Sequence, residues 1–124
     1  MECSCEISAD VQVYSTILSE RWIAARKTHV CGECSERISP GEKYYKEHGL
    51  DDARVFTHKT CADCISIRAN LCSDYFYGQI REMVEEAIWD CEGQLPEKCI
   101  AKLTPGAREW VCDVIEDVWW KEGA

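Results

Sequence analysis

The chain has 124 residues, ten of them cysteine, and carries 14 Lys and Arg against 23 Asp and Glu, for a formal charge of −9. This length is typical of one compact domain, and a hydrophobic share of 46% with five tryptophans excludes a largely disordered polymer. No run approaches the ~20 apolar residues that span a bilayer, and the first residues lack the features of a secretory signal. We therefore expect a cytoplasmic protein without a membrane partner, whose reduced cysteines bind metal rather than form disulfides.

The acidic excess lies in the C-terminal part of the chain. Residues 69–124 contain twelve acids and five bases, which accounts for −7 of the −9. Because nonspecific nucleic-acid binding depends on Lys and Arg that neutralise phosphates, this half is a poor nucleic-acid surface. The first half is not excluded.

Residues 1–30 give mixed signals. Val11 and Val13 alternate as in a strand, whereas the spacing of Leu18 and Trp22 fits a helical stripe equally well. We interpret this segment as a leader packed on or beside the unit that follows, and its secondary structure stays open.

Residues 31–72 are predicted to be a metal-centred unit with a β-hairpin. Its strands are expected over 42–47 and 54–58, with turns at 39–42 and 49–52. Thr60 is expected to be the N-cap of a helix that follows, with Asp63 three residues later as in a capping box.

Two Cys-x-x-Cys pairs frame this hairpin. They are Cys31–Cys34 and Cys61–Cys64, separated by 26 residues. Each pair can present two sulfur atoms to one ion, and a helix start at the second pair would stabilise thiolates. The spacing predicts one structural zinc ion (Zn²⁺) with four cysteine ligands and no open coordination position. Four free thiols or two local disulfides are the alternative.

Other cysteines and histidines are weaker candidates. His58 is an alternative ligand, since it precedes Cys61 by three residues, although a solvated or supporting histidine is the expectation we favour. Cys3 and Cys5 could begin a weak second site with Cys72. We expect Cys72, Cys91 and Cys112 to be buried thiols beside apolar stripes, and the role of Cys99 stays open.

Residues 73–124 are predicted to be an acidic helical region that forms one compact domain with the metal unit. Asp74 is the expected N-cap of its first amphipathic helix, and the apolar face of this helix begins at Phe76. The helix is expected to end before Gly93 and Pro96.

The last amphipathic helix is expected to have Thr104 as its N-cap and Pro105 as its first residue. Its apolar stripe includes Trp110 and Trp119, which we expect in the core, and leaves Trp120 outside. The opposite face carries four acids, Glu109, Asp113, Glu116 and Asp117. The fold class predicted is α+β, a zinc-stabilised hairpin unit followed by two helices.

The metal-centred unit resembles a treble-clef zinc finger in its order of Cys-x-x-Cys, hairpin and Cys-x-x-Cys at a helix start. The run 25–34, the segment 38–44 and the segment 59–64 also resemble small uncharacterised zinc proteins of tailed bacteriophages and prophages. This resemblance implies a zinc-bound fold and a phage origin, with the host cytoplasm as location, and it implies no activity.

The sequence is compatible with two functions. The first is a non-catalytic protein-interaction module, a phage-encoded acidic inhibitor of a host defence or gene-expression protein, with Trp120 and the four acids as contacts. The second is nucleic-acid binding by the finger half through basic residues, namely Arg21, Arg26, Lys27, Arg37, Lys43, Lys46 and Lys59. No nucleophile–base motif or phosphate loop is present, so we do not expect an enzyme.

Overall fold

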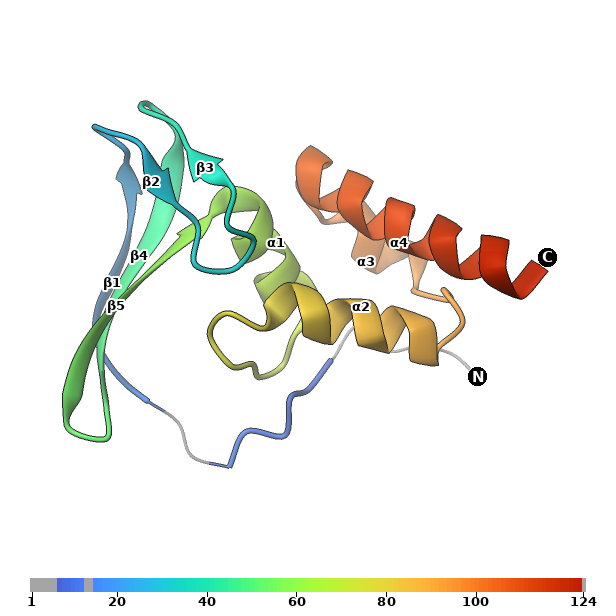
Figure 1. The fold of residues 1–124 in the computed structure, drawn as a ribbon, viewed down its shortest axis with the longest axis horizontal. Coiled ribbons are helices and arrows are strands. Elements are labelled where there is room, and N and C mark those ends of the chain that lie inside the picture. The colour runs from blue at the N-terminus through green and yellow to red at the C-terminus, as the bar shows by residue number, and fades with distance from the viewer. Residues whose placement is uncertain (1–6, 13–14, 124) are drawn as a thin grey trace.

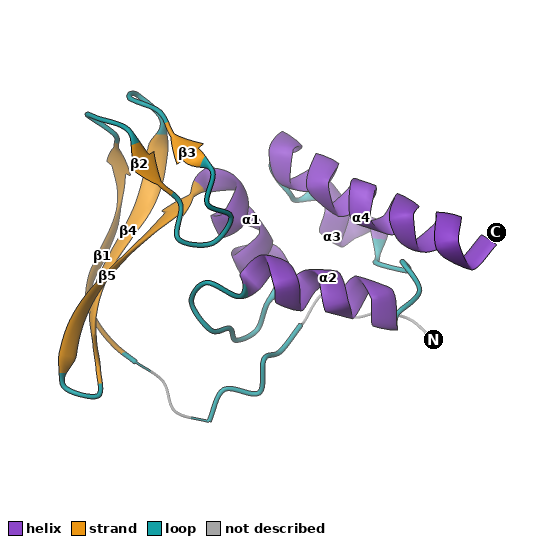
Figure 2. Ribbon diagram, in the orientation of Figure 1, coloured by secondary structure: helices purple, strands orange, loops and turns teal. Residues whose placement is uncertain are grey.

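The computed structural model describes residues 7–12 and 15–123, which form a mixed α+β chain (Figures 1 and 2). The strands are β1 (Thr16–Ala24), β2 (His29–Val30), β3 (Arg37–Ile38), β4 (Lys43–Asp51) and β5 (Arg54–Cys61). The helices are α1 (Ala62–Leu71), α2 (Ile80–Asp90), α3 (Glu97–Ala101) and α4 (Pro105–Gly123). None of the helices in these ranges combines the length and apolarity needed to cross a membrane.

A three-stranded antiparallel sheet has the order β1–β4–β5, and β2 and β3 form a separate two-stranded ribbon. The leader therefore contributes the first strand of the sheet, paired with β4 from Thr16 opposite Leu50 to Ala24 opposite Lys43. Figure 1 shows α1 between this sheet and the other helices. The metal-centred unit is thus completed by a strand that precedes it in sequence.

The hairpin is longer than predicted, and its turn lies elsewhere. β4 runs to Asp51, and the tip residues Asp52 and Ala53 have positive φ angles of 50° and 65°. Gly49 lies inside β4, where an added Cβ would be 2.6 Å from the Phe56 ring. The turn predicted at 49–52 therefore lies at Asp52 and Ala53, and Gly49 leaves room within β4 for a cross-strand aromatic ring.

Two N-cap predictions were also wrong. Cys61 caps α1, because its Sγ accepts a hydrogen bond from Cys64 N, whereas Thr60 is the buried penultimate residue of β5. Asp74 lies six residues before α2 and accepts hydrogen bonds from Ala9 N and Val11 N instead. The aspartate therefore fixes the leader to the α1–α2 connection.

The described residues form two apolar clusters. The larger lies among α1, α2, α3 and α4, and its fully buried members include Ile67, Leu71, Val84, Ile88 and Val111. The smaller surrounds the cysteines and consists of Ala25, Cys31, Ile38, Tyr44 and Cys64. Because α1 contributes Cys64 to the smaller and Ile67 and Leu71 to the larger, this helix joins the two.

Candidate metal centre

Four cysteines meet where β5 passes into α1. Cys31 and Cys34 lie on the tight turn after β2, Cys61 ends β5, and Cys64 lies in the first turn of α1. Their four Sγ atoms all lie within 4.8 Å of one another. The predicted pairs are therefore brought together, and Cys31 and Cys64 are buried while Cys34 and Cys61 are partly exposed.

One sulfur–sulfur distance in the cluster matches the edge of a tetrahedral site. With Zn–S bonds of about 2.3 Å, the edges of a tetrahedral site are about 3.8 Å long. Cys34 Sγ and Cys61 Sγ lie 3.8 Å apart. The donor set of four thiols suits zinc, whose structural sites are closed and four-coordinate.

Backbone amides and shared protons stabilise negative charge on the sulfurs. Glu33 N and Cys61 N donate to Cys31 Sγ at 3.4 and 3.3 Å. Hydrogen bonding to Cys61 and then Cys64 lowers the pKa of Cys31, and hydrogen bonding to Cys31 raises the pKa of Cys61 and of Cys64. Because metal binding requires thiolates, an ion bound here would displace the protons that the cluster still holds.

Arg81 on α2 contacts the cluster and was missed by the sequence analysis. Its Nε donates to Cys64 Sγ at 3.2 Å, and its guanidinium lies 4.6 Å from the centre of the Trp110 ring on α4. Burial alone would lower the pKa of Arg81, but the bond to Cys64 and the nearby cysteines raise it. Arg81 therefore places a fixed positive charge against Cys64, a buried candidate metal ligand.

Glu33, between the first two cysteines, connects the cluster to α2. Its side chain is fully buried and accepts hydrogen bonds from His58 Nε2 at 2.7 Å, Gly78 N at 2.7 Å and Ile80 N at 3.1 Å. The side chain of Gln79, the N-cap residue of α2, accepts no hydrogen bond from the first turn of the helix. The Glu33 carboxylate serves as the acceptor for a backbone amide there instead. Nothing in the local spacing reveals this contact, because the partners lie 25 to 47 residues away.

His58 is placed by Glu33 rather than by the sulfur atoms. Its ring lies 4.5 Å from that of Tyr77, and it covers Gly32 so closely that an added Cβ would be 2.5 Å from His58 Cε1. The metal-compatible group found among the described residues contains the four cysteines without His58. This position agrees with the supporting histidine that the sequence favours.

A second buried carboxylate connects the sheet to α1. Glu47 on β4 is 1% exposed, and its Oε1 lies 2.7 Å from Arg68 Nη1 while its Oε2 accepts from Tyr77 Oη at 3.0 Å. Arg68 also lies over the ring of Tyr75 at 4.7 Å. Because a buried charge is costly unless it is paired, this ion pair fixes α1 against one face of the sheet.

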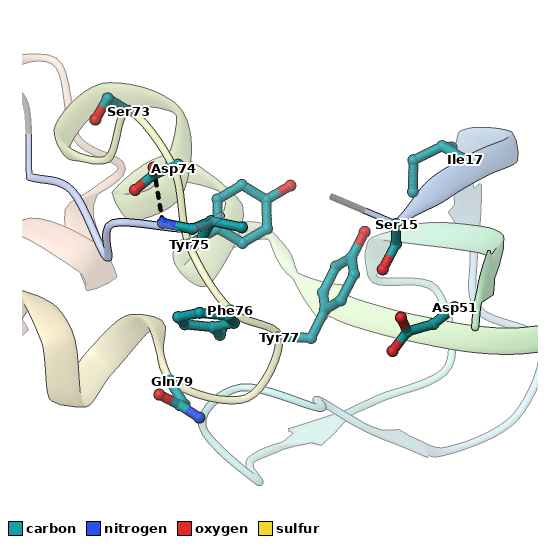
Figure 3. A pocket seen from close by; sticks show the side chains of 10 residues that line it. Ser15, Ile17, Asp51, Ser73, Asp74, Tyr75, Phe76, Tyr77 and Gln79 are labelled. Carbon is teal, nitrogen blue, oxygen red and sulfur yellow. Dashed lines mark hydrogen bonds between the residues drawn. The ribbon is translucent and has the colours of Figure 1, made fainter. Parts of the chain in front are cut away.

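A pocket of about 460 Å³ lies away from the cysteines, between the α1–α2 connection and the start of β1 (Figure 3). Tyr75, Phe76 and Tyr77 line it together with Asp51 and Asp74. The dashed line in Figure 3 is the bond from Val11 N to Asp74 Oδ2 at 3.3 Å. Burial and then the charge of Glu47 raise the pKa of Tyr77, whose hydroxyl is already committed to that carboxylate.

The other cysteines in the part of the chain that the structure describes lie outside this group of four. Cys3 and Cys5 lie outside the described residues, so the second site proposed with Cys72 is not described. Cys91 is buried as predicted, and burial raises the pKa of Cys72 to about 12. Cys112 is exposed on α4, so the prediction that it is a buried thiol was wrong.

Trp120 and the four acids predicted as partner contacts lie on α4, which also carries Trp110 and Trp119. Trp120 is 78% exposed, and four exposed acids precede it: Glu109, Asp113, Glu116 and Asp117. Trp110 is partly buried, but Trp119 is 57% exposed, which contradicts its predicted place in the core. The Trp119 indole donates to Glu92 O at 3.1 Å, so the ring covers the segment after α2 instead.

The seven basic residues are divided among different surfaces. Arg21, Lys46 and Lys59 lie directly opposite one another on adjacent strands. The other four are exposed and lie apart from this row: Arg26 and Lys27 in the bend before β2, Arg37 on β3, and Lys43 at the start of β4.

Comparison of the chain with protein-family models, curated proteins and solved structures gave no match.

Proposed function

We propose that the chain is a non-catalytic, zinc-stabilised protein-interaction module whose helix α4 binds a basic surface of another protein. The observation that carries this proposal is a stripe of acids on α4 that leads to a largely exposed tryptophan. The zinc centre would be the structural core that presents it.

The stripe follows the spacing of one helix face. Glu109, Asp113 and Glu116 are separated by four and three residues, and Trp120 follows four residues later, with Asp117 beside them. The opposite face of α4 is buried through Ala107, Val111, Val114, Ile115 and Val118. An aromatic side chain bordered by acids suits a partner that offers an apolar pocket surrounded by Lys and Arg.

The donor set supports a structural role for the metal. Four thiolates would fill the tetrahedral coordination of zinc and leave no position for an activated water. The Cys-x-x-Cys turn, the β4–β5 hairpin and the second pair at α1 follow one another in the order of a treble clef, which we propose for this unit. The resemblance to phage proteins points to a host defence or gene-expression protein as the target.

Metal content is tested first. Native mass spectrometry of the purified chain should report one zinc ion per chain. Cys31→Ser with Cys64→Ser should abolish zinc binding, whereas Cys112→Ser, a change at an exposed cysteine outside the cluster, should leave one ion bound. A chain that folds and contains no metal would refute the zinc centre.

The binding surface is tested by charge neutralisation. Four substitutions remove the stripe: Glu109→Gln, Asp113→Asn, Glu116→Gln and Asp117→Asn. A matched variant removes four exposed acids of α2: Glu82→Gln, Glu85→Gln, Glu86→Gln and Asp90→Asn. A partner isolated from bacterial lysate should be lost by the first variant and by Trp120→Ser and retained by the second. Equal loss of partner binding in both four-acid variants would show that binding depends on net charge alone. That result would refute the assignment of the binding surface to α4.

A further inference from the structure

One face of the three-stranded sheet carries bases without acids. Because alternate residues of a strand point to the same side, the pairing register defines two adjacent cross-strand rows on this face. We name these six residues the basic face; they are Ser19, His48 and Thr57 in one row and Arg21, Lys46 and Lys59 in the other.

The opposite face of the same strands carries the acids of the sheet. Glu20 and Glu47 are neighbours there, and Glu47 is neutralised by Arg68 of α1. No acid occupies the two rows of the basic face, and among the described residues neither ion pair includes one of its bases. The acids of the three strands are therefore confined to the face opposite these two rows.

The row of three bases is unfavourable for the isolated sheet. Side chains directly opposite on neighbouring strands have Cβ atoms about 4.5–5.5 Å apart, and like charges at this spacing destabilise the pairing. Lys59 Nζ donates to His29 Nδ1 of β2 at 3.2 Å, which holds this ammonium beside the row. An anion bound across the row would relieve this repulsion.

The chemistry of the basic face fits phosphate better than a protein surface. Its two rows offer an ammonium pair, a guanidinium, two hydroxyls and an imidazole, and they contain no apolar side chain. Protein interfaces are centred on apolar and aromatic residues, whereas phosphate contacts are made by Arg, Lys, Ser and Thr. Contacts to phosphate carry no information about the base sequence, which is recognised at the edges of the bases. We therefore expect binding without sequence preference.

The surface is also hollowed at this place. Ser19, Arg21, Lys46 and His48 line a depression of about 190 Å³. Since one water takes about 30 Å³ of liquid volume, this depression has room for an anion of several heavy atoms. His48 Nδ1 lies 2.9 Å from Thr57 Oγ1, which holds the imidazole at the edge of the depression.

We propose that the basic face binds the phosphodiester backbone of single-stranded nucleic acid. This site is separate from the acidic stripe of α4, and it can exist whether or not α4 binds a protein. Most of the net charge of −9 lies in residues 69–124, outside the three strands.

The experiment measures fluorescence anisotropy of a labelled mixed-sequence single strand between about 50 and 200 mM salt. The test variant combines Arg21→Gln, Lys46→Gln and Lys59→Gln, and the matched control combines Arg54→Gln, Lys98→Gln and Lys102→Gln, three exposed bases elsewhere. The test variant should bind at least about tenfold more weakly. Its slope of log affinity against log salt should be shallower by about 2, from about 0.7 for each lost contact. The control should match the native chain.

A second variant guards against loss of zinc, because Lys59 is close to Cys61. Arg21→Gln with Lys46→Gln leaves Lys59 in place and should reduce the slope by about 1.4. Zinc content and far-ultraviolet circular dichroism are recorded for each variant.

Three outcomes would overturn the proposal. These are no salt-dependent binding by the native chain, equal weakening in the matched control, and no weakening in the test variant. Sedimentation of the chain alone tests whether the basic face instead binds the acidic helices of a second copy. Self-association that the test variant abolishes, without nucleic-acid binding by the native chain, would assign the face to a dimer and refute this site.

Discussion

Replacing Glu33 tests how the cysteine turn fixes the helical half of the chain. We expect Glu33→Ala to lower the free energy of unfolding by about 3–6 kcal/mol. The carboxylate accepts three hydrogen bonds, and each bond to a charged group contributes about 1.5–3 kcal/mol. In the variant, water can accept the hydrogen bond from the exposed Gly78 N. The expected loss of stability therefore comes from the two hydrogen bonds to His58 and Ile80.

Urea unfolding with zinc in excess, followed by circular dichroism, measures this change. Glu36→Ala is the matched control, because Glu36 is exposed two residues beyond Cys34 and should change stability by less than about 0.5 kcal/mol. Glu33→Gln should be intermediate, since its amide oxygen can still accept while its NH₂ group faces other donors. A Glu33→Ala chain with full zinc and the stability of Glu36→Ala would refute the role assigned to this carboxylate.

Three further changes test the surroundings of the cluster. Arg81→Met should weaken zinc binding about 10–100-fold in competition with a chromophoric chelator, because it removes a donor to a ligand sulfur; an unchanged affinity would contradict this. Gly32→Ala should cost about 1–3 kcal/mol in urea unfolding, because its Cβ would overlap the fixed His58 ring, and a neutral effect would show that the ring moves freely. Alkylation of the native, reduced chain, read by peptide mapping, should modify Cys112 well before Cys91; equal rates would contradict the register of α4.

The cysteine cluster could be predicted from the sequence because its geometry is local. Each Cys-x-x-Cys pair is presented by a single turn, and only the meeting of the two pairs depends on the fold. The hairpin between Cys34 and Cys61 brings that meeting about, and its alternating pattern is visible in the chain. The amphipathic helices were also readable, since α4 begins at Pro105 as predicted and buries one stripe.

The contacts around the cluster could not be predicted in the same way. Asp74 has the residue type and position of an N-cap, yet the acceptor at the start of α2 is Glu33, 47 residues before Ile80. Leu18 and Trp22 have the spacing of a helical stripe, yet pairing with β4 makes residues 16–24 a strand. In each instance a distant partner determines the outcome, and hydrophobic periodicity contains no information about that partner.

Arg81 shows how two anionic parts of this chain can pack together. Zinc with four thiolates has a formal charge of −2, and the adjoining residues 69–124 add −7. Arg81 is the one base within α2, and it lies inward between Cys64 and the Trp110 ring, whereas Glu82, Glu85 and Glu86 are exposed. A guanidinium suits this position because it remains charged when buried and can donate to sulfur while stacking on an aromatic ring. The acidity that gives α4 its proposed binding surface is therefore compatible with the cysteine cluster, because the single base of α2 faces that cluster.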